Sequence, residues 1–228
     1  MERSHKFITC EQCLSRKSSL FESFSGEELA LLNSKKVCSY YRKNQPLFVE
    51  DSIPRGVFCI NEGKVKVFSR GSEGKEQIIR VAKNGDVLGF RAMFSGDPYA
   101  VSATTLEESN ICFIGKNDFL QLIDTNTTLR DGIMKELSTE LAKRALFIKD
   151  LAQKTVRERL AAILLILDDV YEHDFINMTR EDLSNFIGTA TENLIRTLKD
   201  FKEEELINTQ ARKIKILDHD GLLRATGS

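Results

Sequence analysis

The chain has 228 residues, of which 33 are basic and 34 acidic, giving a formal net charge of −1. A hydrophobic share of 41% beside 29% charged residues is typical of a folded globular protein and excludes a disordered or polybasic chain. The longest apolar run, residues 160–167, is far shorter than the roughly 20 residues that a membrane helix needs. The first residues lead into no apolar stretch, so we expect no signal peptide and a cytoplasmic protein. Five cysteines, an odd number, suit a reducing compartment better than a disulfide framework.

The histidines restrict the enzyme classes that the chain could belong to. There are three, His5, His173 and His219, and none lies between residues 6 and 172. This excludes a histidine-based triad or a histidine metal site built within that stretch. The segment 71–76 lacks the spacing and the hydroxyl of a phosphate-binding loop and indicates a hairpin turn. Because no nucleophile–base constellation is present, we expect no enzyme.

Residues 36–118 have the pattern of a β-domain. Short apolar segments alternate with turn signals such as 62–63, 84–86 and 96–98. The predicted strands include residues 46–49, 56–60, 64–68, 77–81 and 111–114. Short strands at this spacing, about 8–12 residues, predict a sandwich or barrel.

Helical periodicity begins after Asn117, with a first segment near residue 119 and a longer helix over about 129–152. Six residues of the longer helix share one register, five of them apolar: Met134, Leu137, Leu141, Arg144, Ile148 and Leu151. This heptad-like stripe predicts a dimer interface, and the alternative is a helix that covers its own β-domain. Arg144 interrupts the apolar seam, so we expect it to tune the dimer equilibrium.

Residues 155–228 carry the signals of a winged helix-turn-helix. Thr155 opens a helix with capping-box spacing, and Thr179 is a second helix start. Gly188 ends that helix, and Thr189 repeats the capping-box spacing for the next one. Two short helices joined by a glycine turn predict a helix-turn-helix. Two short apolar segments then predict the strands of a wing: residues 206–208 and 213–217.

The second helix of such a pair enters the major groove of DNA with its N-terminus first. Arg196 can bond guanine and Glu192 can accept from cytosine, and their four-residue separation puts both on one helix face. The alternative is an ion pair between these two residues on a solvated helix. We predict DNA contacts from the following residues: Arg180, Thr189, Thr191, Glu192, Asn193, Arg196, Lys199, Arg212 and Lys213.

The charge of this last block counts against strong DNA binding. Residues 155–228 include ten basic and fourteen acidic residues, a balance of −4. DNA-binding domains normally carry a basic footprint. The intrinsic affinity is therefore expected to be modest, with dimerisation needed for tight binding. A sensor module that acts through protein partners without binding DNA is the competing interpretation.

Together these patterns predict an α+β chain in three parts. Residues 1–128 form an N-terminal cysteine segment and a β-sandwich or barrel, which the family resemblance given next implies to be an effector-sensing β-roll of the jelly-roll type. Residues 129–154 form the dimerisation helix, and residues 155–228 form the winged helix-turn-helix domain.

This order of parts, with several sequence motifs, resembles the cyclic-AMP receptor protein / fumarate-nitrate reduction regulator (CRP/FNR) family, closer to its FNR-like branch. The most family-like stretches are residues 45–48 (QPLF), 63–66 (GKVK), 84–89 (NGDVLG), 158–161 (ERLA) and 179–196. Glu192 and Arg196 match the base-reading pair of the family. The resemblance implies a homodimeric transcription regulator, a partly palindromic DNA site, contact with RNA polymerase and allosteric control by a redox, gas or small-molecule signal. Ile195 stands where oxygen-sensing members often carry Ser, which leaves the outer bases of the half-site open.

The resemblance argues against cyclic AMP as the effector. Cyclic-AMP binders carry an acid for the ribose after the Gly-Asp motif, and here that position holds Phe90. Their phosphate-binding Arg-Ser pair is replaced by residues 99–101, and Arg91 lies one position off the motif. A buried phosphate needs a positive partner, and the motif supplies none.

The cysteines point to a different signal. Cys10, Cys13 and Cys112 match three of the four cluster ligands of the oxygen-sensing members, and the fourth position holds Ser19. An iron–sulfur cluster is one interpretation, with Ser19, a carboxylate or Cys38 completing the ligand shell. The alternatives are zinc held with His5, a thiol redox pair, or an inherited site without a metal. We expect Cys38 and Cys59 to be buried free thiols in strands.

Overall fold

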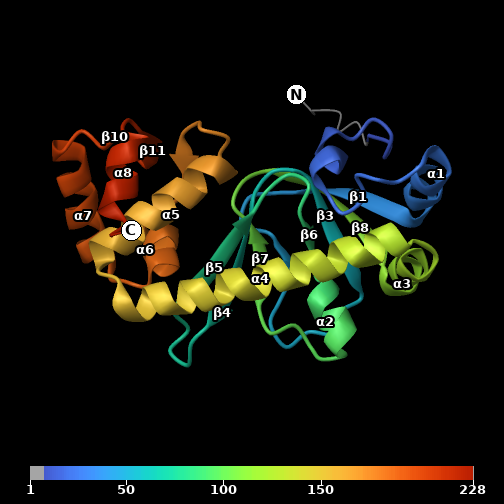
Figure 1. The fold of residues 1–228 in the computed structure, drawn as a ribbon. Coiled ribbons are helices and arrows are strands. Elements are labelled where there is room, and N and C mark those ends of the chain that lie inside the picture. The colour runs from blue at the N-terminus through green and yellow to red at the C-terminus, as the bar shows by residue number, and fades with distance from the viewer. Residues whose placement is uncertain (1–7, 228) are drawn as a thin grey trace. The chain divides into compact units, whose positions relative to one another are not determined.

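A computed structural model describes residues 8–227 (Figure 1). Within that range the chain forms two compact units, residues 8–67 with 82–140 and residues 68–81 with 141–227. His5, named above with zinc, lies outside the described residues.

The β-roll is built from two four-stranded sheets. The first sheet has the order β1-β8-β3-β6 and comprises Lys36–Tyr41, Ser109–Gly115, Gly56–Glu62 and Val87–Leu88. The second has the order β2-β7-β4-β5 and comprises Pro46–Phe48, Ser102–Thr105, Val65–Arg70 and Glu76–Ala82. The predicted β-roll and its five named strands are confirmed, β1 is the strand that was expected around Cys38, and β6 and β7 are additional. The hairpin residues 68–81, at the joined ends of β4 and β5, group with the second unit.

The first sheet is buried on both faces because its strands alternate between two apolar clusters. Ile60 and Ile111 pack with residues of the second sheet between the two sheets. Val57 and Ile114 project from the opposite face into a cluster formed with the N-terminal segment and the nearby helices, here called the helical cluster. Register pairing of Val57 with Ile114, and of Ile60 with Ile111, matches this two-sided pattern.

Short helices contribute to the helical cluster or lie beside it. They are the 3-10 helix η1 (Leu14–Ser18), α1 (Gly26–Lys35), α2 (Phe90–Ser95) and α3 (Lys116–Thr125). Ser25 caps α1 in a reciprocal capping box with Glu28. The strand pattern of residues 36–118 did not predict α2, which occupies six residues between two glycines with left-handed backbone.

The long helix α4 spans Thr127–Gln153, close to the predicted 129–152. The next helix, α5 (Val156–Val170), begins at the predicted Thr155 capping box. The rest of the second unit contains α6 (Arg180–Ile187), α7 (Thr191–Glu203), α8 (His219–Ala225) and a sheet of order β10-β11-β9, formed by Ile207–Gln210, Lys213–Ile216 and Ile176–Asn177. Among the described residues, no helix combines the length and the apolar character that crossing a membrane requires.

Candidate functional site

The helix-turn-helix is formed by α6 and α7. The Thr179 side chain caps α6 by accepting from the backbone N–H of Asp182, and Gly188 ends that helix with left-handed backbone, φ 72°. The N–H groups of Gly188 and Thr189 both donate to the carbonyl of Ser184, at 3.0 and 3.1 Å. The predicted helix-turn-helix and its glycine turn are confirmed.

The start of α7 differs from the prediction in one residue. The prediction that Thr189 is the N-cap of α7 and an exposed DNA contact is wrong. Its backbone N–H closes the turn by donating to Ser184, and the residue is only 8% exposed. Ala190 takes the N-cap position and makes no side-chain cap bond. The Thr191 hydroxyl is hydrogen-bonded to the Ser184 hydroxyl at 3.1 Å, which fixes the two helices at the turn.

Helix α7 has one buried face and one exposed face. The buried face consists of Leu194, Thr197, Leu198 and Phe201. Glu192 and Arg196 lie on the exposed side. The Arg196 guanidinium donates to the amide oxygen of Asn193 at 2.9 Å, and no ion pair within residues 8–227 joins it to Glu192. The structure therefore does not contain the salt bridge that was the alternative to base reading.

Helix α7 carries a further exposed cation near its C-terminus. Lys199 forms an exposed i, i+4 ion pair with Glu203 at 3.5 Å. Such a pair contributes little to stability, so it does not prevent Lys199 from contacting a phosphate.

The wing is held by Arg180, which was predicted to contact DNA. Its guanidinium donates to the carbonyls of Arg212 and Ala211 at 3.1 and 3.3 Å, at the tip between β10 and β11. Burial lowers the pKa of Arg180, although a guanidinium remains charged at neutral pH. Arg212 and Lys213 are exposed at this tip. The arrangement gives Arg180 a positioning role that its sequence position did not reveal.

The six predicted interface residues of α4 divide into two sets. Met134, Leu141 and Ile148, spaced by seven residues, are 60%, 73% and 66% exposed. Leu137 packs against the helical cluster, and Arg144 donates to the carbonyl of Ile79 at 3.0 Å. Leu151 lies against Gly188. The first set is thus the apolar row of α4 that the chain leaves exposed.

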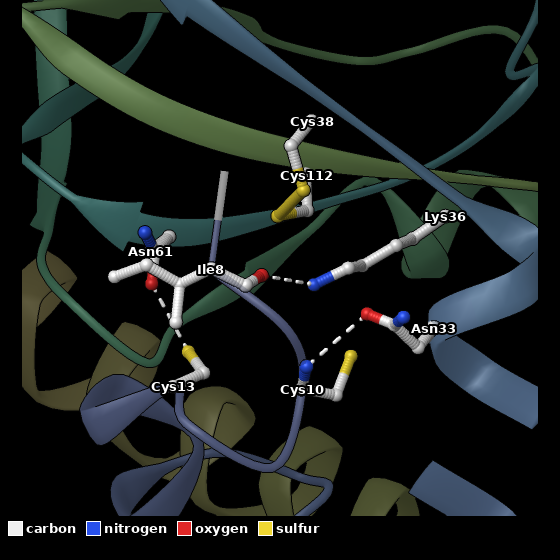
Figure 2. Close-up of a disulfide and its surroundings, with 8 residues drawn as sticks. All are labelled: Ile8, Cys10, Cys13, Asn33, Lys36, Cys38, Asn61 and Cys112. Atoms are coloured by element: carbon white, nitrogen blue, oxygen red, sulfur yellow. Dashed lines mark hydrogen bonds between the residues drawn. A yellow bond between two sulfur atoms is a disulfide. The ribbon is translucent and has the colours of Figure 1, made fainter. Parts of the chain in front are cut away.

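Four of the cysteines line one cavity of about 50 Å³ that is partly open to solvent: Cys10, Cys13, Cys59 and Cys112. The Cys13 thiol donates to the side-chain oxygen of Asn61 at 3.0 Å. Burial raises the pKa of the Cys10 thiol, although Lys36 beside it acts in the opposite direction. Figure 2 shows Cys10 and Cys13 on the N-terminal segment, with Lys36 and the strand cysteines nearby. The structure therefore brings the three predicted cysteines to one place.

Two predictions about the cysteines are wrong in this structure. Cys38 is not a free thiol, because it forms a disulfide with Cys112, and the same bond removes Cys112 from the set of free thiolates (Figure 2). The two residues are direct partners in the ladder of β1 and β8, with Cα atoms 4.0 Å apart. The sequence placed both cysteines in strands but contains no signal for the register that makes them neighbours.

Comparison with known proteins agrees with this architecture. Residues 38–126 match the family model for a cyclic nucleotide-binding domain, and residues 158–225 match that for a Crp-like helix-turn-helix domain. The fumarate and nitrate reduction regulatory protein of Vibrio cholerae is 31% identical over 193 residues, which cover 82% of this chain and 77% of the relative. The chain belongs to the CRP/FNR family. It is a DNA-binding transcription regulator and not an enzyme.

Further matches agree with membership of the CRP/FNR family. Electron transport regulator A of Shewanella oneidensis is 30% identical over 194 residues, covering 82% of this chain and 77% of that protein. Among solved structures, FixK2 from Bradyrhizobium japonicum superposes with a TM-score of 0.77 at 21% identity, covering 85% of this chain and 98% of that one. This structural likeness supports the fold.

The positions that the sequence related to cyclic-AMP binding are occupied by the chain's own contacts. Phe90 is buried in the helical cluster. Tyr99 is buried, stacks on Phe48 with ring centroids 4.1 Å apart and donates its hydroxyl to the Gly56 carbonyl. Arg91 forms an ion pair with buried Glu140 at 3.2 Å.

As the structure places them, the residues do not fit the iron–sulfur cluster of the oxygen-sensing CRP/FNR members. The Ser19 hydroxyl is engaged in a local turn, donating to the Arg16 carbonyl and accepting from the Phe21 N–H. Cys112 is bonded to Cys38. Within residues 8–227, no three His, Cys, Asp or Glu side chains are arranged to hold a metal ion. The remaining arrangement is one of thiols and a disulfide, which is suited to redox chemistry.

Proposed function

We propose that this CRP/FNR regulator acts as a homodimer on a partly palindromic DNA site, contacts RNA polymerase there, and responds to a redox signal at its N-terminal domain. A regulator of bacterial transcription works where the DNA is, so we place it in the cytoplasm. The observation that carries the proposal is the exposed face of α7, which presents Glu192 and Arg196 four residues apart at the N-terminal part of a recognition helix.

Sequence reading rests on these two side chains. The Arg196 fork can donate to the O6 and N7 atoms of guanine, and Glu192 can accept from the amino group of cytosine. The Arg196 bond to Asn193 orients the guanidinium and costs little to exchange for a base, because both groups are near solvent. Arg212 and Lys213 at the wing tip are positioned for phosphate contacts, which supply affinity but no sequence information.

Dimerisation rests on the exposed row of Met134, Leu141 and Ile148. Apolar residues at seven-residue spacing form the seam of a two-helix coiled coil. A second copy of α4 is the occupant that matches this row, and the resulting two-fold symmetry is what a partly palindromic site requires. The acidic balance of residues 155–228 makes a single domain a weak binder, so two domains per complex are needed for tight binding.

The test is a binding-site selection from random DNA, followed by fluorescence anisotropy on the selected site and on an unrelated duplex. We expect Arg196→Ala to weaken specific binding by about 1–3 kcal/mol, roughly fivefold to 150-fold, with a smaller change on unrelated DNA. Arg224→Ala is the matched control, because it removes the same charge from an exposed site on α8. An equal loss on both duplexes, or no loss, would contradict base reading by Arg196.

A further inference from the structure

Three of the five cysteines form a row across the first sheet. Cys38 on β1 is paired in register with Cys112 on β8, and Cys112 is paired with Cys59 on β3. Directly opposite residues of antiparallel strands project from the same face, so the three sulfur atoms share one face. Val57 and Ile114, two residues from Cys59 and Cys112, belong to that face and pack in the helical cluster. The row therefore faces the N-terminal segment that carries Cys10 and Cys13.

The two ends of the disulfide differ in their access to solvent. Cys38 is half-buried on β1, which is an edge strand, and it is flanked by exposed Val37 and Ser39. Cys112 is 9% exposed on β8, which has a strand on each side. Cys38 is thus the more exposed residue of the pair, and attack at its sulfur would make Cys112 the leaving group.

The third cysteine of the row does not compete for this bond. Burial raises the pKa of the Cys59 thiol to about 12. A thiol with so high a pKa is protonated at neutral pH, and only the thiolate attacks a disulfide. Cys59 therefore does not exchange into the disulfide, and Cys112 keeps Cys38 as its bonding partner.

We propose that Cys38 and Cys112 are the reversible redox pair of this regulator, opened by a dithiol reductant and closed by a peroxide. This inference rests on the proposed redox-responsive function and names the residues that carry it. The structure favours it over a metal cluster because the bond already engages Cys112 and the Ser19 hydroxyl serves a local turn.

Opening follows thiol–disulfide exchange. One thiolate of the dithiol attacks the Cys38 sulfur, the bond to Cys112 breaks, and its electron pair leaves on Cys112, which takes up a proton. The second thiol of the reductant attacks the mixed disulfide, releases Cys38 and becomes a disulfide itself. In all, two electrons and two protons pass from the dithiol to the protein.

Closing consumes one hydrogen peroxide. A thiolate of the pair attacks a peroxide oxygen and becomes a sulfenic acid, while hydroxide leaves and is protonated to water. The other thiol of the pair then displaces a second water and forms the disulfide. Two thiols and one peroxide thus give one disulfide and two waters.

Opening or closing the Cys38–Cys112 bond would affect both the cavity and the contacts between the nearby helices. Opening the bond adds the Cys112 thiol to the three free thiols, Cys10, Cys13 and Cys59. Strand β8 continues directly into α3, where Asp118 forms an ion pair at 3.0 Å with Lys35, the residue that precedes β1. The disulfide and this ion pair are thus two links between the β1 end of α1 and the β8–α3 segment.

The first test is differential alkylation of the native protein followed by mass spectrometry. We expect Cys38 and Cys112 to be protected after peroxide treatment, all five cysteines to be reduced by excess dithiothreitol without denaturant, and peroxide to restore the same bridge. Cys38→Ser and Cys112→Ser should each abolish the bridge, whereas Cys59→Ser, the matched control in the same row, should keep it. A bridge between another pair, or one that opens only in denaturant, would overturn the proposal.

The second test measures DNA affinity in both redox states on the selected site. We expect the apparent Kd of the wild-type protein to change about fivefold or more between states, as allosteric couplings typically do, and that of Cys38→Ser to stay constant. A bridge that opens and closes with no change in Kd would refute its regulatory role. A chain that binds no specific DNA in either state would instead refute the proposed function, whatever the alkylation result.

Discussion

Replacing Gly188, in the turn of the helix-turn-helix, by alanine tests how much this turn contributes to stability. Its backbone is left-handed, with φ 72°, and a Cβ there would lie 3.2 Å from a methyl carbon of Leu151 and 3.3 Å from the Gln77 side-chain oxygen. Left-handed backbone costs a residue with a Cβ about 1–2 kcal/mol. Alanine also restricts the unfolded chain more than glycine does, which stabilises the folded state by about 0.4–1 kcal/mol and offsets part of this cost. The close contact with Leu151 adds strain of about 1 kcal/mol or more.

We therefore expect Gly188→Ala to lower the free energy of unfolding by about 1–2.5 kcal/mol. Urea unfolding followed by circular dichroism measures this difference. Gly74→Ala separates the two causes, because Gly74 has φ 77° but no atom within 4 Å of an added Cβ, so only the backbone cost applies. Gly26→Ala, at a helical position with open space, should cost nothing. If Gly188→Ala were as stable as Gly26→Ala, the reasoning about this turn would be refuted.

Two further predictions concern the helix α4 and the Cys59 thiol. Leu141→Glu should raise the dimer dissociation constant at least about tenfold, because a buried leucine contributes about 1.5–3 kcal/mol and both copies lose it. Sedimentation equilibrium measures this constant. Leu223→Glu, which changes another exposed leucine, is the control. An unchanged constant would remove α4 from the interface. Because its pKa is raised from 9.0 to about 12, Cys59 in the reduced protein should have about a thousandfold less thiolate near neutral pH than an ordinary thiol. Its alkylation rate should rise about tenfold per pH unit until the pH approaches 12; a plateau near pH 9, as expected in the urea-unfolded chain, would contradict this assignment.

Local signals predicted the helix-turn-helix with little help from the rest of the molecule. The caps at Thr155 and Thr179 and the left-handed end at Gly188 depend on residues within one helical turn, so their spacing in the sequence is sufficient. Thr189 was predicted wrongly because two competing roles are open to it. Its side chain could cap α7, but its N–H closes the turn onto Ser184, and that choice moves the helix start to the next residue.

Side chains that act at a distance were not predictable in the same way. Arg180 has the charge of a DNA contact, but its guanidinium holds the wing carbonyls of residues 211 and 212, which lie more than thirty positions away. The heptad positions of α4 were recognised, yet which of them remain exposed depends on the surfaces that the helix meets. Leu137 packs on the helical cluster and Arg144 bonds Ile79, whereas Leu141 remains free for a partner.

The sequence by itself determined the family, the order of the domains and the candidate functional residues, because periodicity, helix caps and motifs depend on residues that are close together in the chain. Only the tertiary structure decided how the cysteines are used. Cys38 and Cys112 are separated by 74 residues, and they meet because β1 and β8 pair in one particular register. Register is set by the burial of both sheet faces, a property of the whole core, so a shift of one residue would turn these sulfur atoms to opposite faces.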